Sequence, residues 1–187
     1  MTYSLADLMR MDRSQLHQVM LDGAPLNLSE LVDTQYLGVD LSLPWIGRRL
    51  LWHTFRKTFH QDPVTGQLRG WNVRMEQTGV TGPRIPMTDK KGAPVTFGHY
   101  VLEKADHVDW PGGYRCAHFL DYGHAGNTPL DLARFGYTPL VSVNEGSSEL
   151  LLGWEIFRVG PRFLPMKLYW ALQKDGPLDR VVPPPRA

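Results

Sequence analysis

From residue 53 onward the chain is a succession of short strand-like segments separated by turns, and no long helical pattern interrupts them. The clearest segment is Trp71 to Gln77, in which Trp71, Val73 and Met75 alternate with polar residues. A two-residue period is typical of a strand with one apolar and one polar face. Because parallel strands need long crossover connections, this spacing favours an antiparallel sheet. The other segments that we expect to be strands are Thr34 to Val39, Thr54 to His60, Thr96 to Lys104, Tyr114 to Tyr122, Pro139 to Val143, Glu149 to Val159 and Lys167 to Lys174.

The first third of the chain carries helical signals instead. Ser4 can cap a helix that begins at Leu5, since a serine oxygen can accept from the free N–H groups of a first turn. Apolar residues then recur at spacings of three and four as far as Met20, which is typical of one buried helix face. A further short helix is expected from Trp45 to about Trp52, after Pro44.

Together these segments predict a mainly β fold, an antiparallel β-barrel of about eight strands with short N-terminal helices. A closed meander has no exposed strand edge, and a barrel of about eight strands holds either side chains or one small ligand. The length of 187 residues fits one domain. Within it we expect residues 1–52 to be a helical segment packed on the barrel, residues 53–176 to supply the barrel strands, and residues 177–187 to form a loose, proline-rich tail.

The charge balance excludes a nucleic-acid protein that relies on bulk charge. Lysine and arginine number 20 against 19 aspartate and glutamate residues, a formal charge of +1, whereas phosphate binding needs a clustered excess of cations. One basic run, Arg48, Arg49, Arg56 and Lys57, is too short to indicate a nucleic-acid surface. Next to the apolar residues of the segment 45–52, it could instead mark an interfacial membrane helix.

Location signals favour a cytoplasmic, reducing compartment. The N-terminal residues 1–12 carry acids and no long apolar stretch, so we expect no signal peptide. No run of about 18 apolar residues is present, so we expect no membrane span. The single cysteine, Cys116, excludes an internal disulfide and a multi-cysteine zinc site, and no other spacing predicts a metal site.

Acid–base chemistry is suggested by histidines on two neighbouring strands. If the strands pair as a hairpin, His99 and His118 could both point inward and act as acid and base. Asp121 lies three residues before His124 in a glycine loop and could orient its imidazole. The alternative is structural, because half-buried histidines bonded to the backbone and Asp–His turns are common in proteins that lack a catalytic site.

Aromatic residues are the stronger indication of a pocket. Planar apolar side chains with few polar groups line small-molecule sites, although they can equally well fill a barrel. On the segment that begins at Trp71 we expect the apolar face to meet the core and the polar face to meet solvent. An inward Arg74 would instead bind a ligand carboxylate by a bidentate pair. The candidate ligand-binding residues are Trp71, Arg74, Tyr100, Tyr122, Trp154 and Tyr169.

Short motifs at both ends of the predicted barrel add a family resemblance. The segment TQYLG at 34–38 opens the strands, and LDLARF at 130–135, LLLG at 150–153 and LYWAL at 168–172 close them. This order resembles the lipocalin-like, calycin-type bacterial barrel proteins of the GXWXG-domain kind, with Thr34 in place of the first glycine and Tyr36 in place of the tryptophan. The resemblance implies a barrel with an internal pocket. It implies no activity, because such barrels host binders and enzymes alike.

The leading hypothesis is therefore the binding of a hydrophobic or aromatic small molecule inside a lipocalin-like barrel. The alternative is a small barrel enzyme, an isomerase, cyclase or lyase, that acts on an apolar substrate through His118, His99 or Asp121. A third hypothesis is a subunit whose apolar surface meets another protein, and a homodimer stays open. The sequence identifies neither the ligand nor a cofactor.

Overall fold

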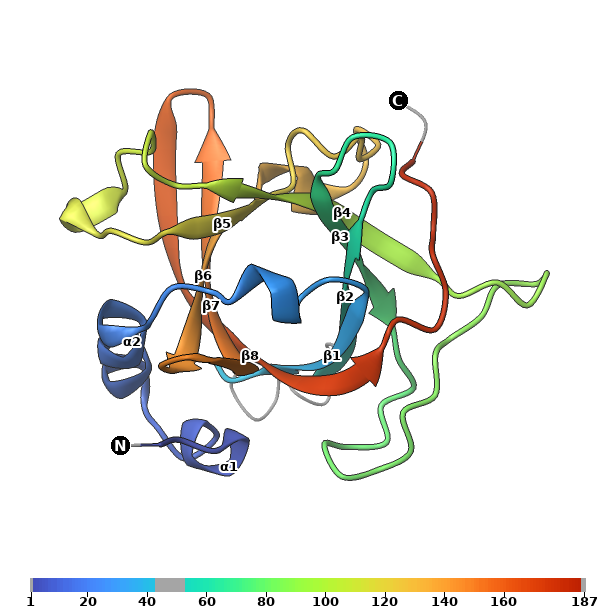
Figure 1. Ribbon diagram of the computed structural model, residues 1–187, viewed down its shortest axis with the longest axis horizontal. Helices are drawn as coiled ribbons and strands as arrows, with labels where there is room; N and C mark the ends of the chain where they lie inside the picture. Colours follow the sequence, from blue (N-terminus) through green and yellow to red (C-terminus); the bar gives the residue numbers. More distant parts are fainter. Residues whose placement is uncertain (1, 43–52, 186–187) are drawn as a thin grey trace.

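A computed structural model describes residues 2–42 and 53–185, and within them the dominant element is a closed barrel of eight antiparallel strands (Figure 1). The strands pair in sequence order, and the last pairs back with the first to close the cylinder. This arrangement confirms the predicted mainly β fold. The strands are β1 (Thr34–Asp40), β2 (Thr54–Gln61), β3 (Leu68–Arg74), β4 (Thr96–Lys104), β5 (His118–Asp121), β6 (Tyr137–Asn144), β7 (Ser147–Val159) and β8 (Arg162–Pro177).

The structure departs from the expected elements mainly before β5. The predicted strand from Tyr114 to Tyr122 is shortened to β5, because the 3₁₀ turn η2 (Pro111–Gly113) and irregular chain precede it. Gly112 and Gly113 lie in the preceding turn with φ values of 69° and 72°, and residues 114–117 continue as irregular chain before the strand begins at His118. The strand expected at Thr34 to Val39 is confirmed as β1, and it lies within residues 1–52. The helix expected from Trp45 to Trp52 lies outside the described residues.

Two short helices, α1 (Leu5–Leu8) and α2 (Arg13–Asp22), lie against the outside of the barrel (Figure 1). Ser4 and Asp12 each form a capping box that satisfies the free N–H groups of the first turn. The buried faces of both helices pack against side chains of the barrel wall in what we call the outer cluster. The outer cluster includes Leu8, Leu16, Met20, Trp154 and Tyr169.

None of the helices in residues 2–42 and 53–185 is long and apolar enough to cross a membrane.

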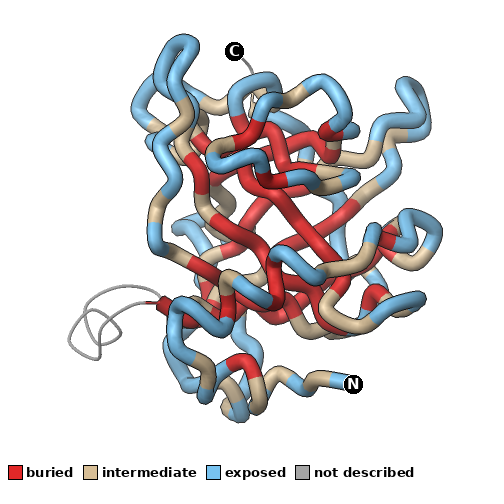
Figure 2. Tube along the Cα trace, turned by 90° about the vertical axis from the view of Figure 1, so that its left-hand side faces the viewer, coloured by how far each residue is buried: buried red, intermediate tan, exposed pale blue. Residues whose placement is uncertain are grey.

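A second cluster, which we call the interior cluster, fills the barrel itself. Leu26 and Leu31 belong to it and flank η1 (Leu28–Glu30), so this segment covers the end of the barrel at which β1 begins. In Figure 2 the crossing strands are buried along their middles, whereas the turns that join them are exposed. The strand residues of the interior cluster are Tyr36, Phe59, Tyr100, Leu102, Leu120, Tyr122, Leu140, Leu151, Trp170 and Leu172.

Cross-strand pairs of a glycine and an aromatic residue position the rings inside the barrel. In one such pair, a methyl group at Gly153 would come within 2.3 Å of the Trp170 ring. The missing Cβ therefore lets the ring fold across the neighbouring strand, a device that also pins the register of the two strands. The pairs within the described residues are Gly38 with Phe55, Gly70 with Tyr100, and Gly153 with Trp170.

The polar face of β3 is the one that looks into the barrel. Asn72 faces the interior, whereas Trp71 and Val73 belong to a separate cluster on the outside. The expectation that this apolar face meets the barrel core is therefore corrected. Leu178 and Val182 of the C-terminal tail pack over the outer face. Because the tail removes that face from water, the strand can keep apolar residues outside and a polar residue inside.

Replacing Gly153 by alanine should lower the free energy of unfolding by about 1–3 kcal/mol, because the added methyl collides with the Trp170 ring. Urea unfolding followed by circular dichroism measures this loss. In a Trp170→Leu background the collision is absent, so the same alanine should cost less than about 0.5 kcal/mol. An equal cost in both backgrounds would show that the ring does not need the glycine.

Candidate functional site

A pocket of about 220 Å³ occupies the end of the barrel at which β1 ends and β2 begins. Its floor is made of buried side chains, and its rim is made of side chains that are partly exposed to solvent. Among the described residues the pocket is therefore open toward this end, while Leu26 and Leu31 fill the other end. The floor residues are Lys57, Asn72, Tyr122 and Trp170, and the rim residues are Asp40, Phe55, Phe97, Ala133 and Glu155.

Asp131 holds one side of the rim in place. It caps the short helix η3 (Leu132–Phe135), and its carboxylate accepts hydrogen bonds from the backbone N–H of Ala133 at 2.9 Å and of Gly98 at 2.8 Å. A Cβ at Gly98 would lie 2.7 Å from Nδ2 of Asn72 and 3.1 Å from Cβ of Ala133. The small residues Gly98 and Ala133 thus keep this side of the pocket free of bulk.

Lys57 is the central residue of the pocket floor. It alternates with Phe55 and Phe59 on the inward face of β2, and its side chain is 1% exposed. Its ammonium donates a hydrogen bond to the hydroxyl oxygen of Tyr122 at 2.7 Å. Aromatic rings surround the ammonium, with the ring centres of Tyr100 at 4.4 Å and Trp170 at 4.7 Å from Nζ. Such cation–π contacts offset part of the cost of removing a charge from water.

The charge state of Lys57 is shifted toward the neutral amine. Burial lowers the pKa of Lys57 to about 7, and the negative charge of Glu155 opposes this shift. Among the described residues, no carboxylate lies within 4.0 Å of Nζ. Glu155 therefore acts on Lys57 through the field across the pocket and not through an ion pair. At neutral pH a substantial fraction of the protein carries an uncharged amine in the barrel.

Glu155 is the acidic counterpart on the opposite wall. It follows Leu151 and Gly153 on the inward face of β7, where the protein surrounds it, yet part of its surface stays accessible through the pocket. Burial raises the pKa of Glu155, and the positive charge of Lys57 opposes this shift. Its carboxylate accepts hydrogen bonds from Trp170 Nε1 at 3.4 Å and from the hydroxyl of Thr138 at 3.5 Å. Both bonds are long, so most of its bonding capacity remains available.

Asn72 adds an amide to the floor. Its Nδ2 donates to the backbone oxygen of Gly98 at 3.0 Å, whereas its Oδ1 is buried and has no hydrogen-bond partner. A buried polar atom without a partner is rare in proteins and commonly marks a place for water or a ligand. Tyr122 beside it is protonated, because burial raises the pKa of its hydroxyl well above the ordinary value. The floor thus offers a hydroxyl, an amine and an amide oxygen to one small guest.

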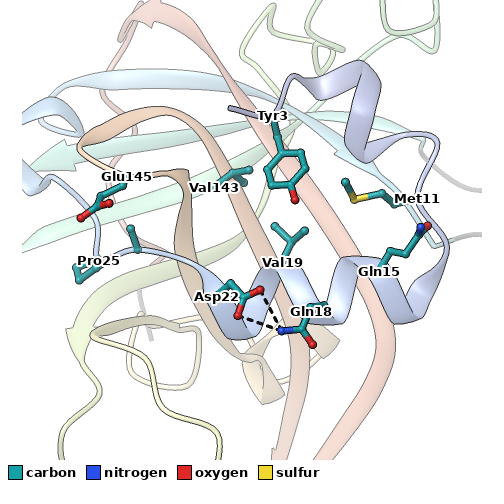
Figure 3. A pocket seen from close by; sticks show the side chains of 10 residues that line it. Tyr3, Met11, Gln15, Gln18, Val19, Asp22, Pro25, Val143 and Glu145 are labelled. Carbon is teal, nitrogen blue, oxygen red and sulfur yellow. Dashed lines mark hydrogen bonds between the residues drawn. The ribbon is translucent and has the colours of Figure 1, made fainter. Parts of the chain in front are cut away.

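A larger hollow of about 620 Å³ lies outside the barrel, between α2 and the end of β6 (Figure 3). Three of its polar side chains, those of Gln15, Gln18 and Asp22, already have local partners. Gln18 donates to both carboxylate oxygens of Asp22 at 3.0 Å, and Gln15 belongs to the capping box of α2. This outer hollow offers no buried polar atom without a partner, in contrast to the barrel pocket. We therefore take the barrel pocket as the candidate site.

The ligand-binding residues predicted from the sequence lie in several separate places. Tyr100 and Tyr122 belong to the interior cluster and contact Lys57. Arg74 lies near the rim, with its guanidinium carbon 5.9 Å from the ring centre of Phe97. The other three are outside the barrel. Trp71 lies under the C-terminal tail, and Trp154 and Tyr169 lie in the outer cluster against α2.

The predicted acid–base residues are not brought together. His99 packs beside Trp71 on the outside of β4, with the ring centres 6.2 Å apart. Asp121 also faces outward and accepts a hydrogen bond from Nδ1 of the exposed His124 at 2.6 Å. His118 is paired with Lys104 across β4 and β5 and lines a different hollow, at the far end of the barrel from Lys57. None of the three lines the pocket.

Sequence reasoning missed Lys57, Asn72 and Glu155 as pocket residues. Lys57 was interpreted as part of a basic run, although the pattern Phe55, Lys57, Phe59 places it between two aromatic residues on one strand face. Glu155 is likewise a lone acid in the apolar segment 150–157. A charged residue flanked on its own face by apolar ones is the signal that could have identified both.

Comparison with family models, with curated proteins and with solved structures found no match to this chain. The barrel itself is consistent with the lipocalin-like fold that the sequence resembles. In the part of the chain that the structure describes, no group of three or more histidine, cysteine, aspartate or glutamate residues is arranged to hold a metal ion.

The pKa of Lys57 predicts a pH-dependent stability that the variant Lys57→Met should lack. Between pH 7 and the ordinary lysine value of 10.5, the unfolded chain binds more protons than the folded protein. The free energy of unfolding should therefore rise with pH, and from pH 7 to 9 the wild type should gain about 2 kcal/mol relative to Lys57→Met. Urea unfolding at both pH values measures the difference.

The matched control is Lys91→Met, in the exposed loop between β3 and β4. This variant should keep the pH dependence of the wild type. If Lys57→Met also keeps the pH dependence of the wild type, burial does not lower the pKa of the Lys57 amine, and the prediction is contradicted.

Proposed function

We propose that this protein binds a small molecule with one aromatic or planar apolar ring and one polar group in the pocket at the open end of its barrel. The observation that carries the proposal is a set of polar residues at the floor of an otherwise largely apolar pocket. Lys57 and Asn72, whose Oδ1 is buried without a hydrogen-bond partner, line a cavity edged by Phe55, Phe97 and Trp170. Pockets of this make-up orient a ligand through a few polar groups and hold it through apolar area.

The size of the pocket supports a ligand of one ring. An apolar cavity of about 150 Å³ is known to accept benzene, and the volume here is about 220 Å³. One ring with a short polar substituent fits that space, whereas a long lipid chain would extend beyond it. The resemblance of the sequence to lipocalin-like proteins implies a barrel with an internal pocket, which this role requires.

Acid–base catalysis by His99, His118 and Asp121 is less well supported than binding. None of these residues lines the pocket, so a ligand held there would not meet them. If the chain has an enzymatic activity in its barrel, the groups available for it are Lys57, Tyr122 and Glu155.

Binding of benzyl alcohol, which carries one ring and one hydroxyl, tests the proposal. At ten times its dissociation constant a ligand stabilises the folded state by about 1.4 kcal/mol, so the melting temperature should rise with its concentration. The variant Ala133→Leu should raise the dissociation constant for benzyl alcohol at least about tenfold, since its larger side chain extends into the pocket. A higher concentration of benzyl alcohol is then needed for the same rise in melting temperature. Thermal unfolding followed by circular dichroism provides the measurement.

Gln15→Leu serves as the matched control, because it alters the outer hollow and leaves the barrel pocket intact. Its stabilisation by benzyl alcohol should equal that of the wild type. Loss of the effect in Gln15→Leu and its retention in Ala133→Leu would place binding in the outer hollow and contradict the proposal.

A further inference from the structure

The amine of Lys57 has the surroundings of a nucleophile and not those of a structural cation. A structural buried lysine is normally paired with a carboxylate, whereas among the described residues the one polar side chain that bonds to Nζ is the hydroxyl of Tyr122. Lys57 lines the cavity, and so does Tyr122, to whose hydroxyl the amine is bonded, so a molecule in the pocket lies close to the amine. Burial also lowers its pKa to about 7, which leaves its lone pair free in much of the protein near neutral pH.

We propose that the pocket binds aldehydes or ketones with a single aromatic ring and that Lys57 holds them covalently as an imine. This inference rests on the proposed binding function. The rings of Tyr100 and Trp170 flank the amine, and Phe55 and Phe97 line the approach to it. A flat carbonyl compound that enters between these rings presents its carbonyl carbon to Nζ.

The bond changes are those of a simple condensation. The lone pair of Nζ attacks the carbonyl carbon as the C=O double bond opens, and one proton passes from nitrogen to that oxygen, which gives a hydroxyl group on the carbon. Nitrogen then gives up its second proton, the hydroxyl group gains a proton and leaves as water, and a C=N bond forms. The sum is one carbonyl compound and one amine giving one imine and one water, with no oxidation or reduction.

Groups in the pocket can carry the two protons. Glu155 faces the same cavity as Lys57, and burial raises its pKa, so it can take the proton that nitrogen loses and return it to the leaving hydroxyl. Asp40 on the rim adds negative charge that raises the pKa of Glu155 further. Tyr122 stays protonated and fixes the amine through its hydrogen bond of 2.7 Å.

Trapping with benzaldehyde and sodium cyanoborohydride at pH 7 tests the proposal on the intact protein. The reagent delivers hydride to the C=N bond and leaves a stable benzyl group on nitrogen, which peptide mass mapping locates. Labelling of Lys57 should exceed that of every other lysine at least about tenfold, because their ammonium groups are almost wholly protonated at this pH. The other lysines are Lys90, Lys91, Lys104, Lys167 and Lys174.

Two variants separate a pocket reaction from general amine reactivity. Lys57→Arg keeps a positive charge and cannot form the imine, so it should show no label in its β2 peptide. Ala133→Leu should lower the labelling of Lys57 at least about tenfold by filling the cavity. In both variants labelling of the N-terminal amine, which also reacts near neutral pH, should stay unchanged and serves as the internal reference.

The outcomes also distinguish this inference from the proposed function. If benzyl alcohol stabilises the protein but benzaldehyde labels Lys57 no faster than Lys91, the pocket binds ligands and the imine is overturned. If neither compound acts at the pocket, the proposed function fails together with the inference. Labelling of Lys57 that persists unchanged in Ala133→Leu would contradict a reaction inside the cavity.

Discussion

The removal of one amine from water governs the organisation of this barrel. Burying an unpaired ammonium costs several kcal/mol. The rings of Tyr100 and Trp170 and the hydroxyl of Tyr122 offset part of this cost by contacting the amine. Glu155 contributes from across the cavity without closing an ion pair. The compensation is partial, so Lys57 remains a weakly basic amine. Both proposals rest on the position of this lysine in the lining of the cavity.

The ring arrangement around Lys57 depends on backbone features elsewhere in the barrel. Trp170 and Tyr100 reach their positions because each folds over a glycine on the neighbouring strand, Gly153 and Gly70 respectively. The two ends of the barrel differ as a result of what fills them. Leucines carried by the segment around η1 close one end, whereas the small residues Gly98 and Ala133 keep the other end open. The polar side chains of Lys57, Asn72 and Glu155 line the cavity at this second end.

Much of the architecture could be predicted from the sequence, because strand alternation and turn residues act locally. The segment Thr96 to Lys104 agrees with β4 at both ends, and the antiparallel order follows from the short connections. The choice of the inward face of β3 could not be predicted, since it depends on Leu178 and Val182 folding back from the end of the chain. Local pattern also could not show that a lysine in a basic run would be enclosed by aromatic rings from distant parts of the chain, among them Tyr100, Tyr122 and Trp170.

The site was predicted less well than the fold for the same reason. Aromatic content alone does not separate rings inside the barrel, such as Tyr122, from rings on its outer wall, such as Trp154. Only the closed register brings Lys57, Asn72 and Glu155 from three separate strands to one cavity.

Titration of the Lys57 side chain by nuclear magnetic resonance tests the central claim most directly. With lysine labelled at Cε and Nζ, and Lys57→Met used to assign the signal, the Lys57 resonance should titrate with a midpoint near pH 7. The other lysines should titrate near about 10.4, the ordinary value. A Lys57 midpoint in that ordinary range would mean that its ammonium is fully compensated or solvated, and the account of the pocket given above would be contradicted.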